Sequence, residues 1–222
     1  MSAKITSLIK NGTKDTFELV RDQVAGILVL ERDNQKALAT AATLDPADWD
    51  FGVYIERANP WESRLNANPP TAGGLVNVMF DSDSVELNKS NSTGRNQYTG
   101  TMHLDCYGFA VAGSGSHGDE AAAKQAQRVA RLVRNILEDG QYRYLDLRGT
   151  VSSRSVNSRT AYQQQLDNRA ALQVSALRIS LQVGYNEYTM EYQGQPIEVI
   201  NISQALDGEV TLAAIQIDFS GA

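Results

Sequence analysis

Two stretches of the chain repeat apolar residues at the three- and four-residue spacing of an amphipathic helix. The first begins at Lys14 and continues to the pair Asp45-Pro46. Its four consecutive apolar residues at 27–30 leave a strand after Gly26 as an alternative. Because good helix formers continue beyond them, the pattern favours an N-terminal helix.

The second helical stretch covers 119–138 and has one continuous apolar stripe. Asp119 and Glu120 occupy its first turn, where the positive end of the helix dipole favours acidic side chains. Gly140 follows as a C-terminal stop. We therefore predict a long central helix here.

Most of the remaining chain alternates apolar and polar residues, as strands do. The strand-like segments are 51–62, 74–83, 98–113, 142–156, 171–188, 197–203 and 209–219. Asp207-Gly208 predicts a tight turn that joins the last two as a hairpin. In 171–188 the residues predicted to face inward are Val174, Ala176, Ile179, Leu181 and Val183. Their phase slips once between Ala176 and Ile179, which indicates a bulge.

These elements predict an α+β fold in which a mostly antiparallel sheet packs against the central helix (119–138) and the N-terminal helix. We expect an N-terminal arm at 1–13, whose apolar residues dock on the domain or on a neighbour, and a single domain over 14–222. Extended polar loops are predicted at 66–74, 82–97 and 152–168.

The composition restricts the function less than the fold. The net charge of −6 is unlike the basic face of a sequence-reading nucleic-acid binder, although an acidic wall suits a channel that DNA must pass without sticking. A single cysteine, Cys106, excludes an intrachain disulfide and a cysteine metal cluster. No apolar run approaches the roughly 18 residues that span a bilayer. We expect a soluble chain made in the cytoplasm, with no membrane partner.

One motif suggests cofactor chemistry. Gly113, Gly115 and Gly118 fit the pattern G-x-G-x-x-G between a strand and a helix, as in dinucleotide sites. However, the acidic residues that begin the helix would repel a pyrophosphate, and the preceding strand alternates where such a fold buries both faces. A flexible connector is the favoured interpretation, and nucleotide binding by an enzyme domain is the alternative.

The other reactive side chains give no catalytic or metal site. On a strand, His103 and Cys106 point to opposite faces and cannot pair. His103 with Asp105 would need further ligands to bind a metal. We predict no catalytic residues, no metal and no cofactor.

Several side chains are candidates for contacts between subunits. Arginine is enriched at interfaces, although the same side chains also suit a solvated face. The candidate arginines are Arg128, Arg131 and Arg134 on the central helix, and Arg154 and Arg159 after it. Trp61 is an aromatic candidate. The alternative for Trp61 is a small core formed with Trp49, Phe51 and Tyr54 around the turn Asn59-Pro60.

Four segments together carry a family resemblance: 15–39, 51–62, 124–137 and 177–192. The chain resembles structural proteins from the neck and tail of contractile-tailed bacteriophages, and it looks most similar to tail terminator or head-to-tail joining ("gateway") proteins. The resemblance covers most of the chain apart from the first dozen residues and the loop 88–97. It has no catalytic residues to carry over.

The resemblance implies a non-enzymatic virion protein that forms a hexameric or dodecameric ring at the head–tail junction. Its implied neighbours are collar or connector, tail tube and sheath proteins, and genomic DNA passes through the lumen without specific binding. Such a ring is assembled in the host cytoplasm. A tail tube, collar or baseplate subunit is a further alternative of the same class.

Overall fold

A computed structural model of the chain describes residues 14–65, 72–87, 95–111, 117–162, 172–188, 199–206 and 210–218. The helices are α1 (Thr16–Ala41), α2 (Glu62–Leu65) and α3 (Gly118–Glu138), with short 3-10 turns η1 (Pro46–Trp49) and η2 (Gly140–Tyr142). The strands are β1 (Gly52–Ile55), β2 (Gly73–Val85), β3 (Arg95–Val111), β4 (Val151–Tyr162), β5 (Leu172–Tyr188), β6 (Val199–Leu206) and β7 (Val210–Asp218). The predicted α+β class is confirmed.

The helix α1 starts where its sequence predicts. The carboxylate of Glu18 accepts a hydrogen bond from the backbone N–H of Asp15 at 3.0 Å, which satisfies a donor that the helix itself leaves unpaired. Residues 27–30 continue the helix, so the alternative of a strand after Gly26 is wrong. The backbone N–H of Thr16 also donates to Glu187 at 2.9 Å, which ties the start of α1 to the end of β5.

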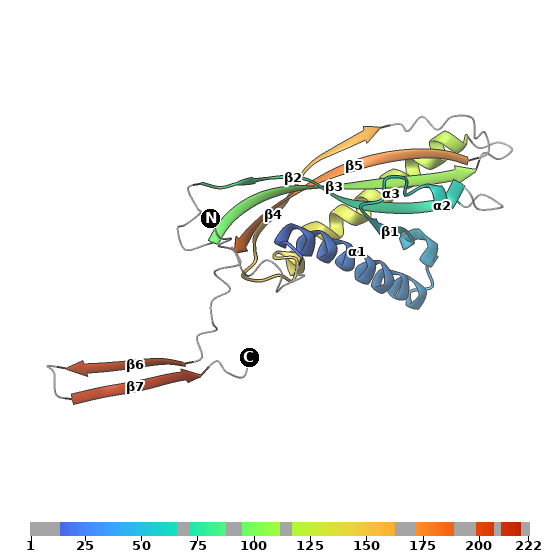
Figure 1. Cartoon of the computed structure of the whole chain (residues 1–222). Helices are drawn as coiled ribbons and strands as arrows, with labels where there is room; N and C mark the ends of the chain where they lie inside the picture. Colours follow the sequence, from blue (N-terminus) through green and yellow to red (C-terminus); the bar gives the residue numbers. More distant parts are fainter. Residues whose placement is uncertain are drawn as a thin grey trace, which may run out of the picture.

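Five strands form one sheet in the order β1-β2-β3-β5-β4 (Figure 1). The sheet is mixed, because β1 pairs with β2 in parallel while the other neighbours are antiparallel. Parallel neighbours need a long connection, and residues 56–72, which include α2, supply it. The alternation of side chains did not predict this pairing, because it does not report strand direction.

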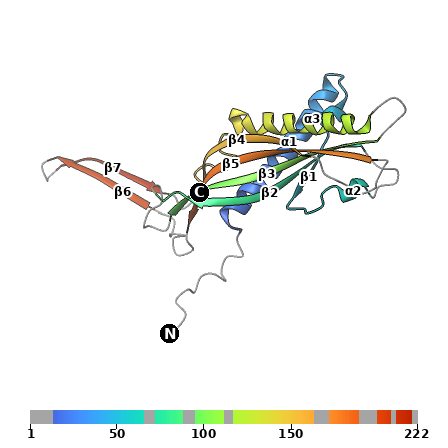
Figure 2. The ribbon, with the colours of Figure 1, turned by 90° about the horizontal axis from the view of Figure 1, so that it is seen from above.

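The sheet has an apolar core on each face. Toward α1 and α3 it presents, among others, Val76, Val78, Leu104, Ile179 and Leu181, all fully buried. A smaller cluster on the opposite face consists of Leu75, Tyr107, Phe109, Leu172 and Ala176, with Trp61 and Tyr54 packed against it. Figure 2 shows α3 and α2 on opposite sides of the sheet.

The second cluster explains the phase slip predicted in β5. The pairing of β5 with β3 runs without interruption from Leu172 to Tyr188, so the predicted bulge is wrong. Instead, Ala176 packs in the cluster opposite the helices and Ile179 in the core beneath them. Apolar residues on both faces of β5 are therefore buried, which explains the slip without any irregularity in the strand. A register shift occurs at Asp81 in β2, between Phe80 and Ser82.

One of the predicted loops is largely strand, and the other two are strand at their ends. Residues 152–162 belong to β4, so the prediction of a loop over 152–168 is wrong for this part. The strand-like segment 142–156 is confirmed only from Val151 onward, because residues 142–150 form turns. In the predicted loop 82–97, residues 82–85 continue β2 and 95–97 begin β3; in 66–74, the last two residues begin β2. Pairing with neighbouring strands supplies order that these polar sequences do not signal locally. Residues 72, 86 and 87 belong to no strand, as predicted, and residues 66–71, 88–94 and 163–168 lie outside the described residues, as does the arm 1–13.

The predicted C-terminal hairpin is confirmed. Strands β6 and β7 pair antiparallel, with Ile202 opposite Ile215, and form a second sheet of two strands (Figure 1). Within the described part of the chain, neither strand pairs with the five-stranded sheet. No helix described here has the length and apolarity needed to cross a bilayer.

Candidate functional site

The reactive side chains of β3 point away from one another, as the sequence predicts. Cys106 is fully buried in the core beneath the helices, and burial raises the pKa of its thiol. His103 lies on the other face, with Nδ1 3.7 Å from a carboxylate oxygen of Asp81. Among the described residues, no group of three histidine, cysteine or acidic side chains is placed to hold a metal.

The glycine motif does not have the strand arrangement of a dinucleotide fold. Its residues Gly113 and Gly115 lie outside the described residues, and Gly118 begins α3. The strand before the motif, β3, pairs antiparallel with both β2 and β5, whereas a dinucleotide site follows a parallel strand. The strand before the motif was predicted to bury only one face, and this is wrong, because residues 106–110 of β3 are buried on both faces.

The three candidate arginines of α3 differ in their contacts. Arg128 forms an ion pair with Asp48 of η1 and so connects α3 to the segment after α1. The Arg134 Nε lies 3.4 Å from a carboxylate oxygen of Glu138, in a contact without hydrogen-bond geometry. Arg131 is exposed and has no ion pair within the described ranges. Arg131 is therefore the one of the three that is available to a neighbour.

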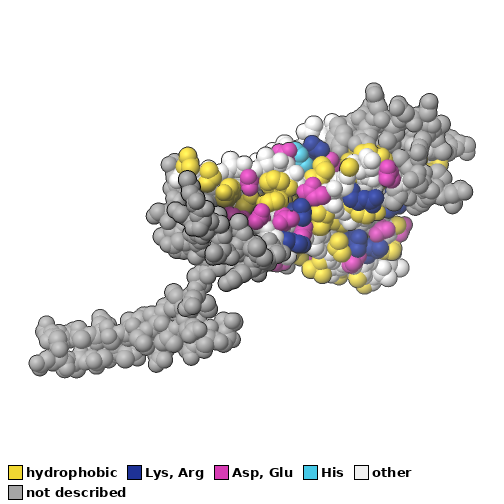
Figure 3. Space-filling model, viewed as in Figure 1, with side chains coloured by type: hydrophobic (Ala, Val, Ile, Leu, Met, Phe, Trp, Pro, Cys, Tyr) yellow, Lys and Arg dark blue, Asp and Glu magenta, His cyan; other side chains and the backbone are white. Residues whose placement is uncertain are grey.

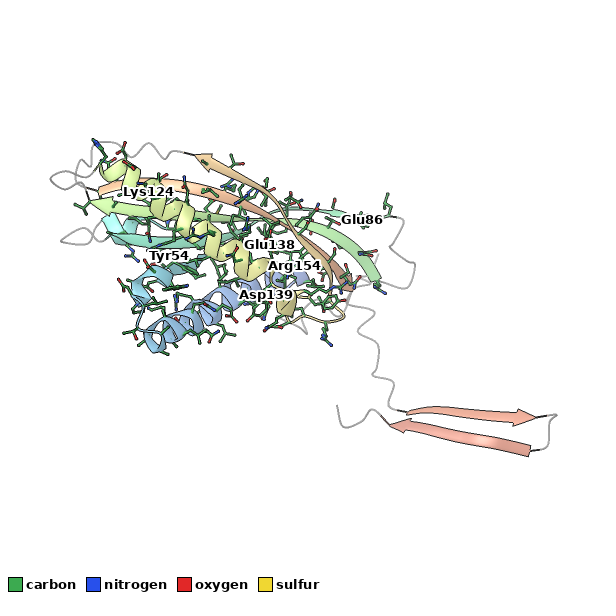
Figure 4. The ribbon with its side chains drawn as sticks, turned by 180° about the vertical axis from the view of Figure 1, so that it is seen from behind. Tyr54, Glu86, Lys124, Glu138, Asp139 and Arg154 are labelled. Carbon is green, nitrogen blue, oxygen red and sulfur yellow. The ribbon has the colours of Figure 1, made fainter. Side chains whose placement is uncertain are left out.

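The two candidate arginines of β4 also differ. Arg154 donates from Nε to the carbonyl oxygen of Tyr142 at 2.6 Å and from Nη2 to that of Asp139, which stabilises the turn after α3 (Figure 4). Burial lowers the pKa of Arg154, and the nearby acids Asp139 and Glu138 oppose that shift. Arg159 is exposed, near the other end of the strand. Thus Arg154 has a role within the fold, and Arg159 is free to contact a partner.

The aromatic residues predicted to cluster around Asn59-Pro60 are divided between two sides of the sheet. The ring of Trp61 lies 5.6 Å from that of Tyr107, centre to centre, in the cluster opposite the helices. Phe51 is buried in the core beneath the helices. Trp49 lines a groove on the helix side. The prediction of one cluster is wrong, because successive residues of an extended segment point to opposite faces.

The sheet has an open edge on each side. β4 is an edge strand with register shifts at Ser152 and Asn157. On the other side, β1 covers only residues 75–78 of β2, so residues 81–85 form an exposed edge. Unpaired N–H and C=O groups on such edges are templates for another strand.

A groove of about 410 Å³ lies between α1 and α3, and we call it the α1–α3 groove. Its lining includes Glu31, Gln35, Trp49, Leu132, Asn135 and Tyr142. The Tyr142 hydroxyl donates to a carboxylate oxygen of Glu31 at 2.5 Å and joins the two walls. This bond lowers the pKa of Glu31 and raises the pKa of Tyr142 to about 12.

No local pattern in the sequence indicates the α1–α3 groove. The helix α1 has exposed apolar residues outside its buried stripe, but they are not among the residues that line the groove. Leu30 is 60% exposed and Leu38 55% exposed, and hydrophobic side chains are visible on the molecular surface in the region of α1 (Figure 3). A helix that is apolar beyond one stripe contacts more than its own sheet.

Replacing Tyr142 with phenylalanine is expected to lower the free energy of unfolding by about 1 kcal/mol at pH 7. Because the folded-state pKa of Glu31 lies below its ordinary value, this stabilisation is present above that ordinary value and is lost as the pH falls through the folded-state pKa. Urea unfolding of both proteins from pH 3 to pH 7 measures the difference. A loss that stays constant over this range would contradict the assignment to Glu31.

The described residues thus provide several candidate contact surfaces: two open sheet edges, the α1–α3 groove, and the exposed side chains of Arg131 and Arg159. No protein-family model matches the chain, and no curated protein sequence matches it significantly. The arrangement presents groups for contact with other chains at several places on one molecule.

Proposed function

We propose that this chain is a non-enzymatic structural protein that forms a closed ring at the head–tail junction of a contractile-tailed bacteriophage. It joins the tail tube and sheath to the collar or connector, and DNA passes through its lumen. The observation that carries the self-assembly is the C-terminal hairpin, which pairs only with itself within the described part of the chain. The phage assignment is supported by the sequence resemblance.

The hairpin needs a partner for physical reasons. A two-stranded hairpin alone is at best marginally stable in water. An extended segment gains stability by adding to an exposed sheet edge, through main-chain hydrogen bonds. The five-stranded sheet of a neighbouring subunit offers such edges at β4 and at residues 81–85 of β2.

Charge selects β4 as the partner of the hairpin. Residues 199–218 contain Asp207, Glu209 and Asp218 and no lysine or arginine, whereas β4 contains Arg154 and Arg159 and no acidic residue. Arg159 is exposed and lies beyond the second register shift, where the edge of β4 is regular. Opposite charges favour this pairing over the β2 edge, which carries Asp81 and Asp83.

A contact between one surface of a subunit and a different surface of the next generates a ring when the rotation closes. The hairpin and β4 make such a head-to-tail pair, and Arg131 is placed to contact a neighbour as well. The net charge of −6 supports a lumen that DNA passes without binding. As part of the proposal, the sheet and its central helix α3 form a tail-terminator-like architecture with six or twelve copies in the ring.

Negative-stain electron microscopy and light scattering of the concentrated protein test the ring. We expect closed rings of uniform diameter for the natural chain. Ile202→Pro removes a backbone N–H from β6 and disrupts the hairpin, so it is expected to weaken association at least tenfold. The control Ile202→Val keeps the backbone and is expected to form rings.

Two outcomes would contradict the proposal: a natural chain that stays monomeric at high concentration, and an Ile202→Pro variant that forms rings as the natural chain does. Thermal unfolding followed by circular dichroism verifies that the five-stranded sheet is intact in the variant. If monomers instead gain thermal stability with NAD or ATP, the alternative of a nucleotide-binding domain is favoured.

A further inference from the structure

The α1–α3 groove has the surface of a binding site for an amphipathic segment. Leu132 and Ile136 on its α3 side are only partly buried, and the half-buried Trp49 lines the other side. Glu31 and Asp139 give it negative charge. Arg32 also lines it, but its guanidinium is held by the carbonyl oxygen of Phe51 and by Asp33.

The N-terminal arm 1–13 has the complementary sequence. Leu8 and Ile9 follow Ile5 by three and four residues, the spacing that places side chains on one face of a helical turn. Lys4 and Lys10 flank them, and the arm contains no acidic residue. Because the whole chain carries −6 and the arm +2, the remaining residues carry −8. The apolar residues of the arm can therefore pack against the apolar residues of the groove, and its two lysines complement the negative charge there.

The arm reaches the groove of its own subunit only when its linker to α1 is almost fully extended. Glu31 and Gln35 lie about 24 and 30 Å from Asp15 along the axis of α1, at 1.5 Å per residue. The six residues from Ile9 to Asp15 span at most about 21 Å when fully extended. A helical turn over residues 5–9 would therefore reach the groove of its own subunit only at its near end and only with the linker to Asp15 fully extended, whereas the arm of a neighbouring subunit has no such limit.

We propose that the α1–α3 groove binds the N-terminal arm of a second copy of this chain, with Ile5, Leu8 and Ile9 against Trp49 and Leu132. Lys4 and Lys10 lie near Glu31 and Asp139. This contact deepens the proposed ring and rests on it, since it connects the same subunits at a second place. An arm that crosses to the next subunit is again a head-to-tail contact.

Disulfide trapping in the full chain tests the arm contact. Leu8→Cys is combined with Asn135→Cys, an exposed residue of α3 that lines the groove. Cys106 is fully buried and does not interfere. We expect mild oxidation to give a ladder of covalent dimers, trimers and larger species under non-reducing denaturing electrophoresis, and neither single variant to give it.

Lys124 provides the matched control. It is exposed on the same helix, 11 residues before Asn135 and about 16 Å away along the axis, near the other end of α3 (Figure 4). Leu8→Cys with Lys124→Cys is expected to give at least fivefold less cross-linked product. An equal yield would show random collision and overturn the proposal.

The outcomes separate this inference from the proposed ring. An oligomer in light scattering without the ladder would contradict the arm contact alone. A cross-linked monomer of altered mobility would show that the arm binds its own subunit, which also overturns the inference. A chain that is monomeric and gives no ladder would contradict both the ring and the arm contact.

Discussion

Replacing Gly108 with alanine is expected to lower the free energy of unfolding by about 3 kcal/mol or more. A Cβ at this position would lie 2.2 Å from the carbonyl oxygen of Ala122 and 2.3 Å from the backbone nitrogen of Ala126. Both atoms belong to the backbone of α3, so no side-chain rotation relieves the overlap. The helix would have to move away from β3 and leave apolar residues poorly packed.

Gly26 provides the control for this substitution. It lies in α1, and a Cβ built there meets nothing within 4 Å. Gly26→Ala is expected to raise the free energy of unfolding by about 0.5–1 kcal/mol, because alanine favours a helix and restricts the unfolded chain. Urea unfolding at one fixed protein concentration measures both, since self-association shifts apparent stability. Equal effects at the two positions would contradict the close contact between α3 and the sheet.

Replacing Arg178 with methionine is expected to cost about 3–5 kcal/mol. On the sheet face opposite the helices, Arg178 donates to both carboxylate oxygens of Asp105, at 2.7 and 2.9 Å. The Asp105 side chain is only 3% exposed. Without the guanidinium, its charge would remain buried beside apolar residues such as Tyr107 and would lose the ion-pair partner that it has among the described residues.

Arg159→Met is the matched control for the ion pair, because Arg159 is exposed on the neighbouring strand β4. At a protein concentration low enough to keep the chain monomeric, where Arg159 contacts no neighbour, we expect it to change the stability by less than about 0.5 kcal/mol. The double variant Asp105→Leu/Arg178→Met is expected to recover much of the loss, because it removes the buried charge together with its partner. If Arg178→Met is as mild as Arg159→Met in urea unfolding, the ion pair does not stabilise the fold.

The two substitutions concern contacts that differ in how visible they are in the sequence. A glycine between Tyr107 and Phe109 within a strand is a known sign of close backbone approach, but its partner, α3, is identified only by the fold. Asp105 and Arg178 are 73 residues apart, and no local pattern connects them. The candidate arginines likewise were found by residue type, and only their contacts separate Arg128 and Arg154, which are engaged within the fold, from Arg131 and Arg159.

By itself, the sequence determined the features that depend on neighbouring residues. The helices α1 and α3 follow from apolar spacing and acidic first turns, the hairpin β6–β7 from alternation around Asp207-Gly208, and the opposed orientations of His103 and Cys106 from the geometry of one strand. The tertiary structure alone decided the parallel pairing of β1, the continuation of β4 beyond residue 156, and the α1–α3 groove. Each of these depends on which distant segments meet and in which register. The free energy of those contacts involves residues far apart in the chain, so a short stretch of sequence does not reveal it.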